Sequence, residues 1–358
     1  MRALRPWFAA LCVTAALAVA SARPAATSGA AGDDPFAWLQ PAITVDASMR
    51  SGIDRGGIAA RMLPAPDGQV TVLLIGRLEA DPDRLAQWAE SIADLKRSAY
   101  VTEIRRFSDP PTLADLNAFT LDDNDLDSVG DCTPGNCAIK IGSADIDSLT
   151  RAAATDSGSE RVQQQFREIV MSRLAAFDAE GFAGLPPYAD RHKPIDPAAI
   201  ATALLDESPY LQSGPLADPA ARTSQFYYWS REQYGTGKPT LTVTHVDIVR
   251  PSTPSAIRVA VIGKEIYASH YRNGSLGLTA AVEDSGGARY LVYVNRTQLD
   301  VLGGFFRSFK RAAVEGRLGD ESVKVFEAVR RRLESGPPPN PVSSSTPRRA
   351  TPDRLPGQ

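Results

Sequence analysis

Five runs with the hydrophobic pattern of β-strands occupy the carboxy-terminal half of the chain. They span residues 225–235, 238–250, 256–271, 274–284 and 288–298, and short segments rich in Gly, Pro and Ser separate them. Consecutive strands joined by short turns form antiparallel meanders. The pattern therefore predicts a five-stranded meander. Asn273-Gly274 predicts a two-residue hairpin turn that places His270 opposite Gly277.

Helical patterns lie on both sides of this meander. Residues 68–81 predict a strand that leads into an amphipathic helix over 81–97, and residues 100–108 predict another strand. Three segments with helix periodicity and start or stop signals follow between about 140 and 206. One long helix, or two with a break near Gly316–Gly319, is predicted from 302 to 335, with apolar residues that include Phe305, Phe306, Phe309, Ala313 and Phe326 facing the sheet.

Both ends of the chain differ in composition from the part between them. Two arginines, an apolar run from Trp7 to Ala20 and a small-residue site ending at Ala22 are typical of a secretory signal peptide. Residues 23–34 predict a flexible leader, and the Pro- and Ser-rich residues 336–358 predict a disordered tail. The apolar run is shorter than the roughly 20 residues of a membrane-spanning helix. We expect a single mature domain over 35–335 that is periplasmic or secreted and does not span a membrane.

Two cysteines remain after signal removal, Cys132 and Cys137, in "CTPGNC". An oxidising compartment and the intervening Pro134-Gly135 turn signal favour a disulfide that closes this turn. A zinc site is the competing interpretation, but the spacing and the lack of a nearby histidine are poor for zinc.

The charge distribution argues against a nucleic-acid partner. The formal net charge is −3, and Lys, Arg, Asp and Glu are mixed along the chain without a basic cluster. The hydrophobic content of 43% is enough for a packed core.

The order of the predicted elements resembles that of the START and polyketide-cyclase-like superfamily. A strand, a helix, further strands and a meander closed by a long helix are typical of its helix-grip fold, here with a helical insertion at about 140–206. The resemblance implies an α+β fold in which an antiparallel sheet wraps around the carboxy-terminal helix and leaves an apolar cavity. The motifs "CTPGNCAIKI", "YYWSREQYGTGKP", "THVDI" and "IYASHYRNGSLGLT" also resemble those of exported bacterial proteins of unassigned activity.

The stretch "EIYASHYRNGSLGLT" holds the first group of candidate site residues. His270 and Tyr271 point to opposite faces if the strand continues through them, and Ser275 comes near His270 only if the chain turns between them. A serine nucleophile normally sits on a sharp strand-to-helix turn flanked by glycines, which this segment lacks. We therefore interpret these three residues as ligand contacts or as structural residues, with no catalytic role assigned.

Other candidates come from the neighbouring strands. His245 and Asp247 share one face of the strand over 238–250. They form a structural pair there, or they line a cavity together with His270. A metal site formed by these three residues is a further alternative, but we assign no metal or cofactor. Asp300 caps the helix that follows or pairs with Arg296, and in a further alternative Arg296 anchors a ligand's carboxylate or phosphate group. Trp229 lies in the core or lines a cavity or a partner surface.

Three functional hypotheses follow from the sequence. The first is periplasmic, non-catalytic binding of an apolar small molecule or lipid between the meander and the carboxy-terminal helix. The second is an exported hydrolase or metal-assisted enzyme that uses His245 and His270. The third is a structural or interaction protein of the cell envelope.

Overall fold

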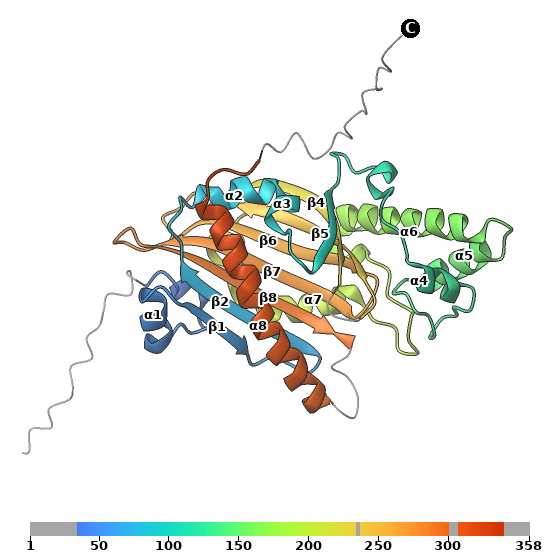
Figure 1. The fold of residues 1–358 in the computed structure, drawn as a ribbon, viewed down its shortest axis with the longest axis horizontal. Coiled ribbons are helices and arrows are strands. Elements are labelled where there is room, and N and C mark those ends of the chain that lie inside the picture. The colour runs from blue at the N-terminus through green and yellow to red at the C-terminus, as the bar shows by residue number, and fades with distance from the viewer. Residues whose placement is uncertain (1–33, 234–236, 301–306, 340–358) are drawn as a thin grey trace, which may run out of the picture. The chain divides into compact units, whose positions relative to one another are not determined.

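Eight antiparallel strands form one sheet in the order β1-β2-β8-β7-β6-β5-β4-β3 (Figure 1). The computed structural model describes residues 34–233, 237–300 and 307–339, and only the backbone of residues 307–320. The strands are β1 (Ile58–Leu63), β2 (Gln69–Arg77), β3 (Val101–Arg106), β4 (Arg222–Glu232), β5 (Thr240–Val249), β6 (Ile257–Ala268), β7 (Arg272–Glu283) and β8 (Arg289–Leu299). Strands β4 to β8 pair in sequence order, so the predicted meander is confirmed.

The helices precede, interrupt and follow the strands. They are α1 (Ala47–Asp54), α2 (Asp83–Glu90), α3 (Ile92–Leu95), α4 (Asp123–Val129), α5 (Ser143–Ala153), α6 (Gly158–Glu180), α7 (Pro197–Asp206) and α8 (Arg307–Glu334). Short 3-10 turns occur at Ala37–Leu39, Leu113–Leu116, Gly181–Gly184, Pro209–Leu211, Gly214–Leu216 and Pro219–Ala221. The protein is therefore α+β, with an antiparallel sheet and several helices, as the sequence predicts.

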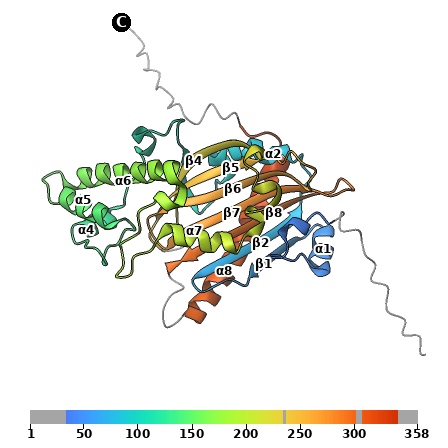
Figure 2. The same cartoon turned by 180° about the vertical axis from the view of Figure 1, so that it is seen from behind.

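The two faces of the sheet carry different helices. On one face, Val72 and Leu74 of β2 pack with Trp88 of α2 and Phe326 of α8. The intervening Leu73 points to the opposite face, because successive strand side chains alternate, and it packs there with Leu204 of α7. Figure 1 shows α8 crossing the first face, and Figure 2 shows α7 on the other. We call them the α8 face and the α7 face.

The helical insertion packs at the β4–β5 end of the α7 face. Phe166 of α6 stacks on Phe119, and Trp229 and Tyr267 complete a fully buried aromatic group with them. Burial of such rings stabilises the insertion, since each side chain removes a large apolar area from water.

Cys132 and Cys137 form the predicted disulfide, with their Cα atoms 4.5 Å apart. The Gly135 backbone has φ +92°, a conformation that favours glycine, and its amide donates to the Ala189 carbonyl at 2.7 Å. The Cys137 amide donates to the carbonyl of Asp190. The closed turn thereby fastens the end of α4 to the segment between α6 and α7.

Three details differ from the predicted elements. The β6–β7 connection is Ser269–Tyr271, while Asn273 and Gly274 belong to β7, so the predicted Asn-Gly turn is wrong. Tyr271 takes the left-handed conformation of the turn, with φ +60°. The helix predicted over 81–97 is broken at Ser91 into α2 and α3, and the hydrophobic pattern did not indicate β1 or α1.

Some predictions lie outside the described residues. These are the signal peptide over 1–22, almost all of the leader, the tail from residue 340 and the side chains of Phe305, Phe306, Phe309 and Ala313. Within the described part of the chain, every helix is too short or too polar to cross a membrane.

Candidate functional site

Strands β6 and β7 separate from each other before they reach their connecting turn. Their ladder ends at the pair Lys264 and Leu276. Beyond it, β6 stays paired with β5 as far as Ala268, and β7 begins at Arg272 paired with β8. We call this divergence, residues 265–268 of β6 and 272–275 of β7, the fork. Such a divergence leaves room for side chains between two strands of an otherwise continuous sheet.

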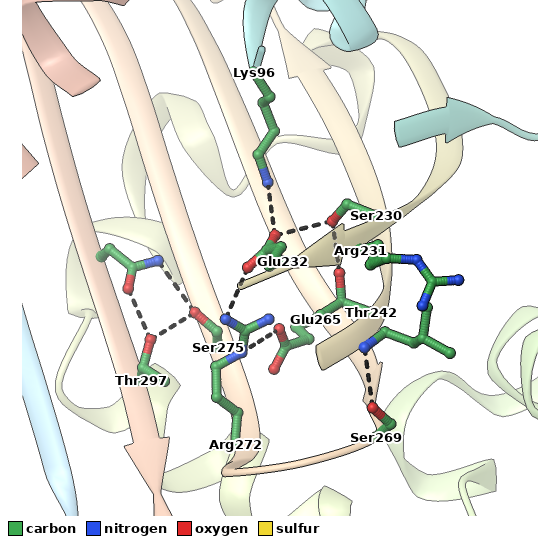
Figure 3. Close-up of polar contacts among 12 residues, drawn as sticks. Lys96, Ser230, Arg231, Glu232, Thr242, Glu265, Ser269, Arg272, Ser275 and Thr297 are labelled. Atoms are coloured by element: carbon green, nitrogen blue, oxygen red, sulfur yellow. Dashed lines mark hydrogen bonds and ion pairs between the residues drawn. The ribbon is translucent and has the colours of Figure 1, made fainter. Parts of the chain in front are cut away.

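Charged side chains occupy the fork and its surroundings. Arg272 Nη1 donates to Glu232 Oε2 at 2.9 Å, and Arg272 Nε lies 2.9 Å from Glu265 Oε2 (Figure 3). Ser230 Oγ donates to Glu232 Oε1 at 2.9 Å, and Lys96 Nζ lies 3.5 Å from the same oxygen. We call Lys96, Ser230, Glu232, Glu265 and Arg272 the Arg272 cluster.

Three of the four charged side chains of the cluster are buried, and the fourth, Lys96, is about one-third exposed. The side chains of Glu232 and Glu265 are each 7% exposed, and that of Arg272 is 16% exposed. Ser230 and Glu232 follow Tyr228 at a spacing of two along β4, and Tyr228 packs among the residues of the α8 face. Strand alternation therefore directs these polar residues to the face that α8 crosses. Because isolated buried charges are costly, Glu232 and Arg272 depend on their ion pair to remain ionised.

The two carboxyl groups on Arg272 have opposite pKa shifts. Burial raises the pKa of Glu232, but the charges of Arg272 and Lys96 and the bonds from Arg272 and Ser230 outweigh it and lower the pKa to about 2. For Glu265, burial and the nearby Glu232 charge outweigh Arg272, so its pKa is raised. A raised pKa beside a lowered one means that Glu265 is the member of this pair that takes up a proton first.

A small cavity of about 40 Å³ lies beside the fork, under α7. Its lining is mostly apolar and comprises Phe182, Tyr188, Pro197, Ile200, Ala201, Leu204, Leu205, Lys264, Glu265, Ile266, Asn273, Gly274, Ser275 and Leu276. The volume holds roughly two or three water molecules. Helix α7 approaches closely, because a Cβ atom on Gly274 would lie only 3.1 Å from Ile200 Cγ2.

Two side-chain oxygens of residues that line the cavity have no hydrogen-bond partner among the described residues. They are Glu265 Oε1 and Asn273 Oδ1, and both are buried. Buried acceptors without a donor are rare in folded proteins and destabilise them by about 1–3 kcal/mol each. Glu265 pairs with Thr244 of β5, which alternates with Val246 of the α8 face, so the Glu265 carboxyl group lies on the α8 face with the rest of the Arg272 cluster.

The residues predicted around His270 separate into different environments. Ser275 lines the cavity, and its hydroxyl lies 2.8 Å from Thr297 Oγ1 and accepts from Asn295 Nδ2 at 3.1 Å. His270 is buried outside the cavity lining, with Nε2 2.8 Å from Asp125 Oδ2 of α4. Its position is structural, because it joins α4 to the β6–β7 turn.

Asp125 is held from a second side, and Tyr271 belongs to the same arrangement. Lys238 Nζ donates to Asp125 Oδ1 at 2.6 Å, and the Lys238 amide donates to Tyr271 Oη at 2.8 Å. Burial raises the pKa of Asp125, but His270 and Lys238 outweigh it, so the pKa is lowered. Tyr271 is 37% exposed, with its hydroxyl directed at the backbone rather than at the cavity.

His245 and Asp247 lie near each other on β5, as predicted from strand alternation. His245 Nε2 is 4.0 Å from Asp247 Oδ1, but Asp247 makes closer ion pairs with Arg222 at 2.8 Å and Lys264 at 2.7 Å. Burial against the Tyr227 ring lowers the pKa of His245 to about 4, although the Asp247 charge opposes this. His245 is therefore a neutral imidazole in a packed environment.

His245 and His270 do not meet. The Ser269 amide, beside His270, donates to the Leu241 carbonyl of β5, four residues from His245. At about 3.3 Å per strand residue this places the two histidines about 13 Å apart along the strand. Among the described residues, no three His, Cys, Asp or Glu side chains are arranged to hold a metal ion.

Arg296 and Trp229 have structural contacts. Arg296 Nη1 donates to Thr71 Oγ1 at 3.0 Å, whereas Asp300 pairs with Lys140 at 3.0 Å, so the alternative in which Arg296 pairs with Asp300 is wrong. Trp229 is fully buried and donates to the Asp115 carbonyl at 2.9 Å, so it is a core residue.

The sequence reading missed the Arg272 cluster. The sequence did contain an indication of this cluster. Lys264 and Glu265 interrupt an otherwise apolar strand pattern, and Glu232 lies at the end of a second strand pattern. Charged residues inside strand patterns also occur on solvated faces, so the sequence alone did not distinguish the two cases.

The arrangement can bind and orient a small molecule through hydrogen bonds and can exchange a proton at Glu265. Comparison with known proteins adds no assignment, since the chain matches no known protein-family model and no curated protein.

Proposed function

We propose that this protein binds a small apolar molecule at the fork between β6 and β7, in the cavity under α7. The observation that carries the proposal is the mostly apolar cavity between α7 and the fork, whose lining includes Asn273 with its buried, unpartnered side-chain oxygen. Ligand sites typically combine an apolar wall with a few placed polar groups. The cavity of about 40 Å³ is far smaller than a typical ligand site of roughly 300–1,000 Å³, so binding requires α7 to move away from the sheet.

The position of α7 supports such a movement. The helix has ten residues, and the cavity is bounded on its side by Pro197, Ile200, Ala201, Leu204 and Leu205. Segments built mainly of 3-10 turns and irregular chain flank α7 at both ends. Displacement of α7 therefore changes few sheet hydrogen bonds, and its apolar residues then cover the apolar part of a ligand.

We also propose the finer fold inferred from element order, a helix-grip in which the sheet wraps α8. Strand β2 lies next to β8, α2 and α3 connect β2 towards β3, and α8 contacts β1 and β2. These contacts agree with that arrangement. Binding between the sheet and α8 remains the alternative location, and the carboxyl group of Glu265 lies on that face with the Arg272 cluster. The signal-like residues 1–22 support a periplasmic or secreted setting for this activity.

A matched pair of α7 variants tests the proposal. Ala201 lines the cavity, whereas the next residue, Thr202, is exposed. The mature wild-type protein, Ala201→Leu and Thr202→Leu are purified under native conditions, extracted with organic solvent and analysed by mass spectrometry. We expect a stoichiometric apolar compound with the wild type and Thr202→Leu, and its loss from Ala201→Leu. An extract that is empty for all three proteins, or equal for all three, would refute binding under α7.

A further inference from the structure

Arg173 of α6 is a buried cation with an unused hydrogen-bonding edge. The residue is 1% exposed, and its Nη1 donates to the Pro186 carbonyl at 3.1 Å. Its Nε and Nη2 atoms have no partner among the described residues. These two nitrogens lie on the same edge of the planar guanidinium group, where their N–H bonds point in one direction. Arginine uses this edge to bind both oxygens of a carboxylate or phosphate group.

The charge of Arg173 also lacks a compensating anion. Burial raises the pKa of Asp145, while the Gly142 amide and the Arg173 charge lower it, so Asp145 interacts with Arg173 through space. Asp145 Oδ2, however, accepts from the Gly142 amide at 3.1 Å, and no carboxylate in the described part of the chain forms an ion pair with Arg173. Buried charges in proteins are normally paired, because an isolated one is costly.

Two tyrosine rings lie against the guanidinium group. Arg173 Cζ is 4.6 Å from the centroid of the Tyr188 ring and 5.7 Å from that of Tyr267. These contacts stabilise the cation in part, but they supply no negative charge. Burial raises the pKa of Tyr188 although the Arg173 charge opposes this, so the Tyr188 phenol is neutral at pH 7. The Tyr267 hydroxyl is buried without a partner among the described residues, which leaves a second donor close to Arg173.

We propose that Arg173 anchors a buried binding site for a carboxylate group. Arg173 Nε and Nη2 donate to its two oxygens, and the Tyr267 hydroxyl is the additional donor. A carboxylate carries one negative charge and compensates one unpaired cation, whereas a phosphate dianion brings an excess negative charge towards Asp145. The irregular segment between α6 and α7 covers Arg173 with Pro186 and Tyr188, so the carboxylate enters when this segment moves. The site does not depend on ligand binding under α7.

The carboxylate has two possible sources. It belongs to a small free acid, or it is the head group of an apolar ligand under α7, since Tyr188 both contacts Arg173 and lines that cavity. Sodium acetate and sodium octanoate represent the two sources. Each is titrated into the mature protein by isothermal titration calorimetry at neutral pH, with sodium chloride as the reference anion. We expect a carboxylate to bind and chloride not to, because a single ion lacks the two oxygens that match this edge.

Two variants of α6 test the role of Arg173. Arg173→Lys keeps the charge but loses the two-donor edge, so it is expected to weaken carboxylate binding at least about tenfold. Arg161→Lys makes the same change at an exposed position of the same helix and is expected to leave binding unchanged. If circular dichroism shows that Arg173→Lys does not fold, Tyr267→Phe replaces it, because it removes only the unpartnered hydroxyl; we expect it to weaken binding at least about threefold.

The outcomes also identify the source of the carboxylate. Binding of both acids indicates a site for small acids, and binding of octanoate alone indicates the head group of an apolar ligand; both support the site if Arg173→Lys weakens the binding. Binding of neither acid, equal binding of chloride, or an affinity that is unchanged in Arg173→Lys, or in Tyr267→Phe where that variant replaces it, overturns the site. None of these results refutes binding under α7, which the Ala201→Leu extract tests separately.

Discussion

Glu232 and Glu265 share one arginine but respond to pH with opposite sign, and this difference provides a test of the Arg272 cluster. We consider Glu232→Gln and Glu265→Gln, which remove one carboxylate each at nearly constant volume. Arg272 lies 2.9 Å from an oxygen of either residue, and the two carboxyl side chains are equally buried. The variants are therefore matched in geometry and differ in the pKa of the group that is removed.

The contribution of Glu232 to the free energy of unfolding follows from its pKa. It falls from 4.5 to about 2 in the folded protein, because Arg272 and Lys96 outweigh the effect of burial. Each pKa unit corresponds to about 1.4 kcal/mol, so the ionised carboxylate contributes about 3 kcal/mol to the free energy of unfolding. Because the folded-state pKa is lowered, this contribution is present above pH 4.5 and is lost as the pH falls towards 2.

Glu265 behaves in the opposite way. Burial and the Glu232 charge raise its pKa, so the folded state binds the Glu265 proton more tightly than the unfolded state does. Its favourable contribution is present below pH 4.5 and is lost as the pH rises through the folded-state pKa. At pH 7 we therefore expect Glu265→Gln to destabilise the protein less than Glu232→Gln.

Urea unfolding of the wild type and both variants at pH 7, 5, 4 and 3 measures these effects. The difference between wild type and Glu232→Gln is expected to be about 3 kcal/mol at pH 7 and to shrink as the pH falls below 4.5. A difference below about 0.5 kcal/mol at pH 7, the usual size of a surface effect, would refute the reasoning, as would one that does not change down to pH 3.

Three further predictions concern other parts of the molecule. The His245 imidazole is expected to titrate with a midpoint near pH 4 rather than 6.5, measured from its ring proton shifts by NMR, and a midpoint above 6 contradicts its burial against Tyr227. His270→Ala is expected to lower the free energy of unfolding by about 2 kcal/mol, because it removes the buried hydrogen bond to Asp125 while Lys238 still pairs with that carboxylate. Urea unfolding measures this, and a change within 0.5 kcal/mol, roughly that of a surface substitution, argues against the pair. Gly274→Val is expected to lower the free energy of unfolding by about 1–3 kcal/mol, because the valine side chain would enter space filled by Ile200 of α7. The same urea assay measures this, and an unchanged free energy of unfolding would mean that α7 does not pack against Gly274.

Strands and turns could be predicted from the sequence where the hydrophobic periodicity and the turn-forming residues indicate the same structure. Residues of β5 and β8 alternate or run apolar over ten or more positions, and their pairing partners follow in sequence order, so the meander could be derived from the sequence. The short loop and the Pro134-Gly135 step similarly indicated the Cys132–Cys137 disulfide. These features depend on neighbours within a few residues, which a sequence pattern records directly.

The turn between β6 and β7 shows where such a pattern fails. Asn273-Gly274 has strong local turn chemistry, yet β7 starts at Arg272 because its partner is β8, and Tyr271 takes the left-handed conformation instead. Pairing with a strand about 25 residues away outweighed the local preference. His270, predicted as a possible cavity residue, is fixed by Asp125, which lies 145 residues earlier in the chain.

The sequence by itself therefore determined the α+β class, the meander and the disulfide, because composition and short-range periodicity specify all of them. Only the tertiary structure decided which polar residues are buried together. Lys96, Glu232 and Arg272 come from three distant segments, and their shared burial depends on strand register and on the fork in the sheet. The cavity also requires α7 to lie over β7, a contact between parts of the chain about 70 residues apart. Long-range register and helix placement arise from the packing of the whole sheet, and no local pattern specifies them.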